Sequence, residues 1–166
     1  MAKEIERKFL LNDNEFVKLL IASGTGKRFR QGYLSVYSEK SSATVRLRAV
    51  PDQGYKLTVK GPKEGATCDE FEYDIPPFDG STMWPLCQHK IEKTRFCLPI
   101  GRFVFEIDVF HGVLEGLVVA EIELFDENDD FPRPGWLGKE VTEDSRYSNS
   151  NLGQITENWE VQTLLY

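Results

Sequence analysis

The chain has 166 residues, of which 40% are hydrophobic and 28% charged, and 27 acidic against 20 basic residues give it a net charge of −7. This composition is typical of a folded globular protein of one domain, covering residues 1–166, and excludes a disordered, collagen-like or membrane-spanning chain. The acidic balance also argues against a protein that follows a nucleic-acid backbone.

In chain order, short segments that alternate apolar and polar residues predict β-strands separated by Gly, Pro, Asp or Ser clusters. Residues 13–22 are an exception. There, an apolar stripe is formed by Phe16, Leu19 and Leu20, Asp13 is a candidate N-cap and Gly24 follows the end, which predicts a helix. The predicted strands are 3–10, 27–37, 43–50, 54–60, 67–75, 88–98, 102–110 and 117–124, with a short ninth around 139–142.

Outside the strands, a few further segments have a recognisable pattern. We expect a helical turn at 81–87, interrupted by Pro85, and another at 148–153. The last segment, 154–166, is compatible with an amphipathic helix. The polar, proline-containing stretch 126–138 (DENDDFPRPGWLG) is expected to be the most flexible loop.

Cysteine and histidine are too sparse for the common sites that use them. Cys68, Cys87 and Cys97 form no CxxC pair and the only histidines are His89 and His111, which excludes a zinc knuckle or a thioredoxin-type motif. No GxSxG element offers a serine nucleophile. An odd cysteine count and a charged segment where a signal peptide would be apolar predict a cytoplasmic protein. Chemistry is left to carboxylates, basic side chains and a hard metal ion.

Seven of the predicted strands carry two or more ionisable side chains at positions i and i+2, on one face of the strand. Like charges so placed lie roughly 7 Å apart and repel each other unless an opposite charge lies between them. The charged faces can point outward around an apolar core, or inward to line a tunnel. A tunnel with both signs of charge would suit a polyanion with divalent cations. The residues are Glu4, Glu6 and Lys8; Arg46 and Arg48; Lys56 and Lys60; Glu70, Glu72 and Asp74; Lys93 and Arg95; Glu106 and Asp108; Glu121 and Glu123.

A family resemblance rests on the order of these segments. EIERKF contains an ExExK pattern, and QGYL, VRLR, KLTVKG, EFEYDI, KTRF, FEIDVF, VVAEIEL and finally KEVTEDSRYSNSNL follow it. In this order they resemble the CYTH superfamily, the triphosphate tunnel metalloenzymes, over nearly the whole chain. The resemblance implies a β-rich α+β fold, an eight-stranded antiparallel closed β-barrel with a few peripheral helices. It also favours the inward orientation of the charged faces.

The resemblance implies roles for individual residues. Oxygen ligands favour Mg²⁺ or Mn²⁺ over zinc, and the matching metal-binding carboxylates are Glu4, Glu6, Glu121 and Glu123, with Asp108 as a further contributor. The residues expected to bind the triphosphate are Lys8, Arg46, Arg48, Lys60, Lys93 and Arg95. Glu70 and Glu72 would be supporting acids of the tunnel. Glu4, Glu6, Lys8 and Tyr33 are the expected catalytic residues, although Tyr33 could equally be a tyrosine packed at a strand end.

The short form of the chain resembles the members that hydrolyse inorganic triphosphate to pyrophosphate and phosphate. The same site could act on an organic substrate, as a nucleoside or thiamine triphosphatase or as a class IV adenylate cyclase that forms cyclic AMP. Those cyclases carry a His-Phe element several residues before ExExK, whereas only residues 1–3 precede Glu4 here. A non-catalytic polyphosphate-binding module would have little use for so many carboxylates. We expect a monomer or homodimer whose partner is a small triphosphate, with no nucleic acid or membrane.

Overall fold

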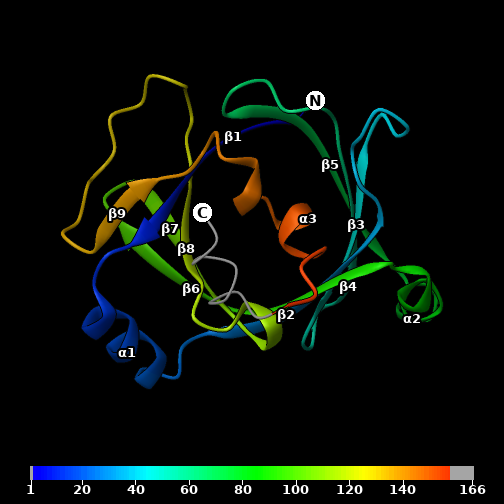
Figure 1. Ribbon diagram of the computed structural model, residues 1–166, viewed down its shortest axis with the longest axis horizontal. Coiled ribbons are helices and arrows are strands. Elements are labelled where there is room, and N and C mark those ends of the chain that lie inside the picture. Colours follow the sequence, from blue (N-terminus) through cyan, green and yellow to red (C-terminus); the bar gives the residue numbers. More distant parts are fainter. Residues whose placement is uncertain (1, 158–166) are drawn as a thin grey trace.

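Eight strands form one closed antiparallel barrel in the computed structural model, which describes residues 2–157 (Figure 1). Around the ring the order is β1-β5-β4-β3-β2-β6-β7-β8, and β8 returns to β1. This confirms the predicted architecture. The bounds are β1 Ala2–Leu11, β2 Lys27–Ser35, β3 Thr44–Val50, β4 Gly54–Lys60, β5 Thr67–Ile75, β6 His89–Ile100, β7 Phe103–Phe110 and β8 Val118–Glu123. The short ninth strand, β9 (Leu137–Glu140), lies beside β1.

The barrel closes at β1, which pairs with two strands in succession. Its first part lies against β5, in a register that runs from Ala2 opposite Glu70 to Ile5 opposite Thr67. From Glu6 onward the same strand pairs with β8. One strand therefore joins the two ends of the sheet, and the predicted metal-binding residues of the ExExK pattern lie on it.

The apolar faces of β1, β7 and β8 lie outside the lumen and pack beneath α1 (Asn14–Ala22) and residues 124–137. The predicted N-cap is confirmed, since the Asp13 carboxylate accepts a hydrogen bond of 2.9 Å from the backbone N–H of Phe16. The stretch 126–138, expected to be a flexible loop, is instead packed down. Phe131 is only 5% exposed, and the Trp136 ring stacks on Phe16 with ring centroids 4.9 Å apart.

The remaining helical segments are short. The expected turn at 81–87 is present as the end of α2 (Pro77–Met83) followed by η1 (Trp84–Leu86). Of the expected amphipathic helix at 154–166, residues 154–157 are not helical and the rest lie outside the described residues. Within residues 2–157, no helix is both long enough and apolar enough to cross a bilayer. The other segments are η2 (Gly112–Leu114), η3 (Ser145–Tyr147) and α3 (Asn149–Leu152), which confirms a turn at 148–153.

In Figure 1 the orange segment α3 lies within the outline of the ring of strands. Its anchor is Leu152, which is 1% exposed and packs in an apolar cluster with Tyr33, Ile91 and Phe110. We call residues 141–151 the strap. The strap is tied to β1 because the backbone N–H of Val141 donates to the carbonyl of Lys8 at 2.8 Å.

Candidate active site

A cavity of about 580 Å³ occupies the lumen of the barrel. Its walls carry the charged faces of the strands, so the inward orientation is the one that the fold adopts. On β3, for example, Arg46 and Arg48 line the cavity, while Leu47 between them is fully buried on the other side of the sheet. All but two of the residues proposed from sequence line it: Glu4, Glu6, Lys8, Tyr33, Arg46, Arg48, Lys60, Glu70, Glu72, Arg95, Glu121 and Glu123.

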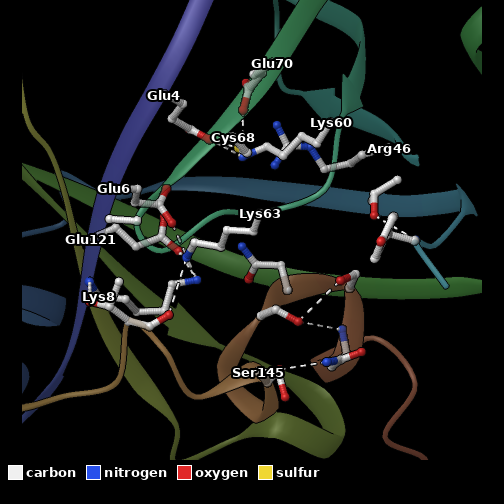
Figure 2. Close-up of a pocket in the computed structure, with 18 of the residues that line it drawn as sticks. Glu4, Glu6, Lys8, Arg46, Lys60, Lys63, Cys68, Glu70, Glu121 and Ser145 are labelled. Carbon is white, nitrogen blue, oxygen red and sulfur yellow. Dashed lines mark hydrogen bonds and ion pairs between the residues drawn. The ribbon is translucent and has the colours of Figure 1, made fainter. Parts of the chain in front are cut away.

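On the acidic side of the cavity, two lysines hold the carboxylates (Figure 2). The Lys60 ammonium lies 2.5 Å from an oxygen of Glu4 and 2.6 Å from an oxygen of Glu70. The Lys8 ammonium lies 3.0 Å from Glu121 and donates to the backbone carbonyl of Tyr147 in the strap at 3.3 Å. These contacts join β1, β4, β5, β8 and the strap around one acidic cluster.

The acidic side holds more negative charge than these lysines neutralise. Burial raises the pKa of Glu6, and the neighbouring Glu121 carboxylate raises it further. Burial likewise raises the pKa of Glu4 and of Glu123. For Glu121, burial opposes ionisation, but Lys8, Arg95 and Lys93 together hold its pKa well below the usual range. Burial also opposes the ionisation of Glu70, but Glu4 and Lys60 lower its pKa. For Glu4, Glu6 and Glu123, the nearby cations do not offset the cost of burying a charged carboxylate.

A divalent cation fits this set chemically. The donors are carboxylate oxygens, which Mg²⁺ and Mn²⁺ prefer, and a positive ion would relieve the repulsion that raises the pKa of these groups. Within the described residues 2–157, no three His, Cys, Asp or Glu side chains are gathered closely enough to hold a metal ion. The reason is visible in the contacts, because the carboxylates of Glu4 and Glu6 face Lys60 and Lys8 instead.

On the basic side, Arg48 is a half-buried cation that forms no ion pair with the residues that the structure describes. In the part of the chain that the structure describes, no carboxylate lies within 4.0 Å of its guanidinium, and its Nε atom is buried without a hydrogen-bond partner. Burial, followed by repulsion from Arg46 and Arg95, lowers the pKa of Arg48 to about 10. The guanidinium of Arg48 lies 5.6 Å from the centroid of the Phe29 ring. Arg46 beside it donates to Thr58 at 3.1 Å, and its own Nε lacks a partner.

Asp108 and Lys93 are the two predicted site residues that do not line the cavity. Asp108 is fully buried, and its carboxylate accepts hydrogen bonds from Arg95 and, at 2.5 Å, from the Lys93 ammonium. Burial, with repulsion from Arg95, lowers the pKa of Lys93 to about 8 despite this pairing. The predicted roles of Asp108 in the metal set and of Lys93 at the triphosphate stay predictions. In this structure Asp108 lies behind Arg95 and accepts hydrogen bonds from Arg95 and from Lys93.

Tyr33 lines the cavity and is also packed in the wall. Its catalytic role stays a prediction. It is 3% exposed, and its hydroxyl accepts a hydrogen bond of 2.8 Å from the amide of the fully buried Gln31. Burial raises the pKa of the hydroxyl. Tyr33 is therefore neutral at physiological pH and able to donate a hydrogen bond into the cavity.

Several lining residues were missed by sequence reasoning. Glu106 lies in the wall and pairs with Arg95; its position two residues before Asp108, on the same strand face, was the available signal. Lys63 comes from the turn between β4 and β5, where no strand periodicity applies. The strap adds neutral polar side chains, for which the sequence carries no periodic signal: Ser145, Ser148, Asn149, Ser150 and Asn151.

Comparison with known proteins is consistent with this geometry. The family model described as CYTH domain matches residues 2–156. An inorganic triphosphatase of Acetivibrio thermocellus is 45% identical over 92% of this chain and 94% of its own, and one of Nitrosomonas europaea is 37% identical over 90% and 95%. A crystal structure of an inorganic triphosphatase superposes with a TM-score of 0.62 at 34% identity, covering 95% of this chain and 98% of that one. The chain therefore belongs to the CYTH domain family.

Proposed function

We propose that this protein is a divalent-metal-dependent hydrolase that cleaves inorganic triphosphate to pyrophosphate and phosphate inside the barrel. The relatives at 45% and 37% identity bear the name inorganic triphosphatase, and each is matched over at least nine-tenths of its length. This supports an inorganic substrate over the organic alternatives. The matched region, residues 2–156, includes the whole barrel and the strap, which supports treating the chain as one domain.

The single observation that carries the proposal is the lack of a counterion at Arg48. A guanidinium withdrawn from water is costly unless an anion accompanies it. Among the described residues no carboxylate lies within 4.0 Å of Arg48, and only the more distant Glu72 and Asp108 offset its charge. Arg46 and Arg48 lie two residues apart on the same face of β3, and each guanidinium presents several N–H donors, a geometry suited to phosphate oxygens. A triphosphate would add negative charge beside Arg48 and beside Arg46, whose nearest carboxylate, that of Glu72, is 3.7 Å away.

The carboxylates on the opposite wall support a metal requirement. We infer that Glu4, Glu6 and Glu123 hold Mg²⁺ or Mn²⁺, because burial and mutual repulsion raise their pKa values and a cation would reverse that penalty. When bound, such an ion supplies Lewis acidity, which withdraws charge from the phosphate oxygens. On metal binding, Lys60 and Lys8 would be released from Glu4 and Glu6 and become available to the substrate.

The residues of the chain would then act mainly by positioning and by charge neutralisation, as in other phosphoryl transfers. Arg46, Arg48 and Lys60 would hold the phosphate chain between the two walls. Arg95 would act from the same wall, fixed by Asp108 behind it. Glu70 and Glu72 would support Lys60 and Arg46 respectively. Tyr33 would donate a hydrogen bond to the substrate or to the attacking water.

The test is phosphate release from inorganic triphosphate, ATP and thiamine triphosphate, each with Mg²⁺, with Mn²⁺ and with a chelator. Inorganic triphosphate with metal should give the highest kcat/KM, and the chelator should abolish turnover. Arg48→Gln should lower kcat/KM by about 10- to 100-fold, as expected for one charged hydrogen bond in a buried site. Arg28→Gln is the matched control, since Arg28 is exposed and pairs with Glu92 outside the cavity.

Three outcomes would contradict the proposal. Faster turnover of ATP or thiamine triphosphate than of inorganic triphosphate would assign the site to an organic substrate. Formation of cyclic AMP from ATP would identify a cyclase. Binding of triphosphate with no turnover under any metal condition would identify a binding module.

A further inference from the structure

Lys63 lines the cavity, yet it belongs to none of the ion-pair clusters of the site. It lies in the turn that joins β4 to β5, residues 61–66. The turn is closed by paired backbone hydrogen bonds between Glu64 and Thr67, of 2.8 and 3.0 Å, and Gly65 within it has a φ of +59°. The turn is therefore defined by its own backbone and holds Lys63 at one end of the lumen.

The Lys63 ammonium has a weak partner. It donates to the backbone carbonyl of Thr142, in the strap, at a distance of 3.4 Å. Across residues 2–157, no carboxylate lies within 4.0 Å of it, whereas Lys8, Lys60 and Arg95 each contact at least two. Lys63 is exposed, so a long hydrogen bond to a neutral oxygen leaves its ammonium free to exchange this partner for a ligand oxygen.

The acceptor, by contrast, is held firmly. The Thr142 hydroxyl accepts from the backbone N–H of Lys8 at 3.0 Å, and Val141 next to it bonds to the Lys8 carbonyl. The side chain of Lys63 thus connects the β4–β5 turn to the strap, which is itself hydrogen-bonded to β1. Figure 2 shows its side chain over the pocket, between the strand that carries Glu6 and the strap that carries Ser145.

The residues that line the cavity directly after Lys63 in the sequence, Gly65, Ala66 and Cys68, carry no positive charge. The cavity-lining side chain of β5 that is next along the chain is Cys68, whose thiol donates weakly to Glu4 at 3.6 Å. Burial raises the pKa of that thiol to about 11, so it is neutral. The strap contributes Glu143 and Asp144, which are acidic, and neutral serine and asparagine side chains.

We propose that Lys63 is a substrate-binding residue that contacts one end of the phosphate chain, with its ammonium exchanging the Thr142 carbonyl for a phosphate oxygen. The inference rests on the proposed function, because it assumes a triphosphate in the lumen. We expect the contact to form with the bound substrate and with the transition state alike, because Lys63 lies in the β4–β5 turn and supplies no ligand to the proposed metal ion. It should therefore affect KM and leave kcat unchanged.

The experiment compares Lys63→Gln with the wild type in steady-state hydrolysis of inorganic triphosphate. The KM should rise by about three- to ten-fold, the range for one partly solvated charged contact, and kcat should stay within two-fold. The KM of the variant should also depend less steeply on salt concentration, because one ionic contact is missing. Lys63→Arg should restore the KM. Lys40→Gln is the control, since Lys40 is exposed and does not line the cavity.

A KM for Lys63→Gln equal to that of Lys40→Gln would overturn the inference. A fall in kcat at unchanged KM would also overturn it, because Lys63 would then act through the position of the strap. Calorimetric titration with inorganic triphosphate in the absence of divalent metal measures the contact without turnover, and Lys63→Gln should weaken binding by the same factor. Absence of turnover in the wild type contradicts the proposed function alone, while equal calorimetric Kd values contradict the role of Lys63 alone.

Discussion

Replacement of Asp108 by asparagine tests whether this residue supports Arg95 and Lys93 or binds metal. Its carboxylate is fully buried and accepts three hydrogen bonds from cations: 2.5 Å from Lys93, and 2.6 and 2.7 Å from Arg95. Asparagine keeps one acceptor oxygen, so about two of these bonds are lost, each contributing about 1.5–3 kcal/mol. Breaking a buried ion pair by removing one partner costs about 3–5 kcal/mol. We therefore expect Asp108→Asn to lower the free energy of unfolding by about 3–5 kcal/mol at pH 7.

The same substitution should have a characteristic pH dependence. In the wild type the pKa of Lys93 is about 8, so its ammonium is charged at pH 7 beside Asp108. Without that carboxylate, burial should keep Lys93 neutral in the folded variant. The folded variant then binds one proton fewer than the folded wild type between pH 7 and pH 8. Above pH 8 the wild type loses this proton too, so the stability difference should shrink by about 1.4 kcal/mol between pH 7 and pH 9.

Urea denaturation at several pH values measures both effects. Glu106→Gln is a matched control, because Glu106 also pairs with Arg95 but its side chain is 41% exposed, and it should cost less than about 1 kcal/mol. Equal losses in the two variants would refute the reasoning about Lys93. If the Asp108→Asn protein is stable but its Tm no longer rises on addition of Mg²⁺ or Mn²⁺, Asp108 is a metal ligand after all.

Two further predictions concern the acidic wall. Glu4→Gln should lower kcat by roughly 10²- to 10³-fold, comparable to the loss of other preorganised electrostatic groups, and the circular dichroism spectrum should stay unchanged. Full metal-dependent turnover in this variant would show that Glu4 does not bind the metal. Glu15→Gln, on the exposed face of α1, is the control. The raised pKa values of Glu4 and Glu6 mean that the folded protein binds more protons than the unfolded chain above pH 4.5, so this contribution to stability falls as pH rises. Metal ions compete with protons for these carboxylates. The increase in Tm caused by Mg²⁺ or Mn²⁺ should therefore be larger at pH 8 than at pH 5. An increase that does not depend on pH would show that the metal binds to other groups.

Strand periodicity predicted which side of the sheet each charged residue occupies, because alternate side chains of a strand point to opposite faces. Arg46, Arg48 and Glu121 line the lumen as expected. Periodicity does not predict how far along the lumen a residue lies. Glu106 and Asp108 share one face of β7, yet Glu106 lines the cavity while Asp108 is enclosed by Arg95 and Lys93.

Segments without a regular period were predicted less well. The acidic residues of 126–138 indicated a flexible loop, but two aromatic side chains within it, Phe131 and Trp136, pack over the barrel. Lys63 and the strap were not recognised as parts of the site. Their place depends on tertiary contacts with β1, such as the one between Lys8 and Thr142, which no local pattern encodes.

The seam at β1 has a consequence for how the site arises. Glu4 meets Lys60 only when the start of the chain is hydrogen-bonded to β5, more than sixty residues later in the sequence. Loop-closure entropy makes contacts this distant in sequence slow to form. An intermediate that has its hairpins but not this pairing would have no acidic wall opposite Arg48. The ability to bind a polyanion together with a metal ion should therefore appear late in folding, when the backbone hydrogen bonds between β1 and β5 form.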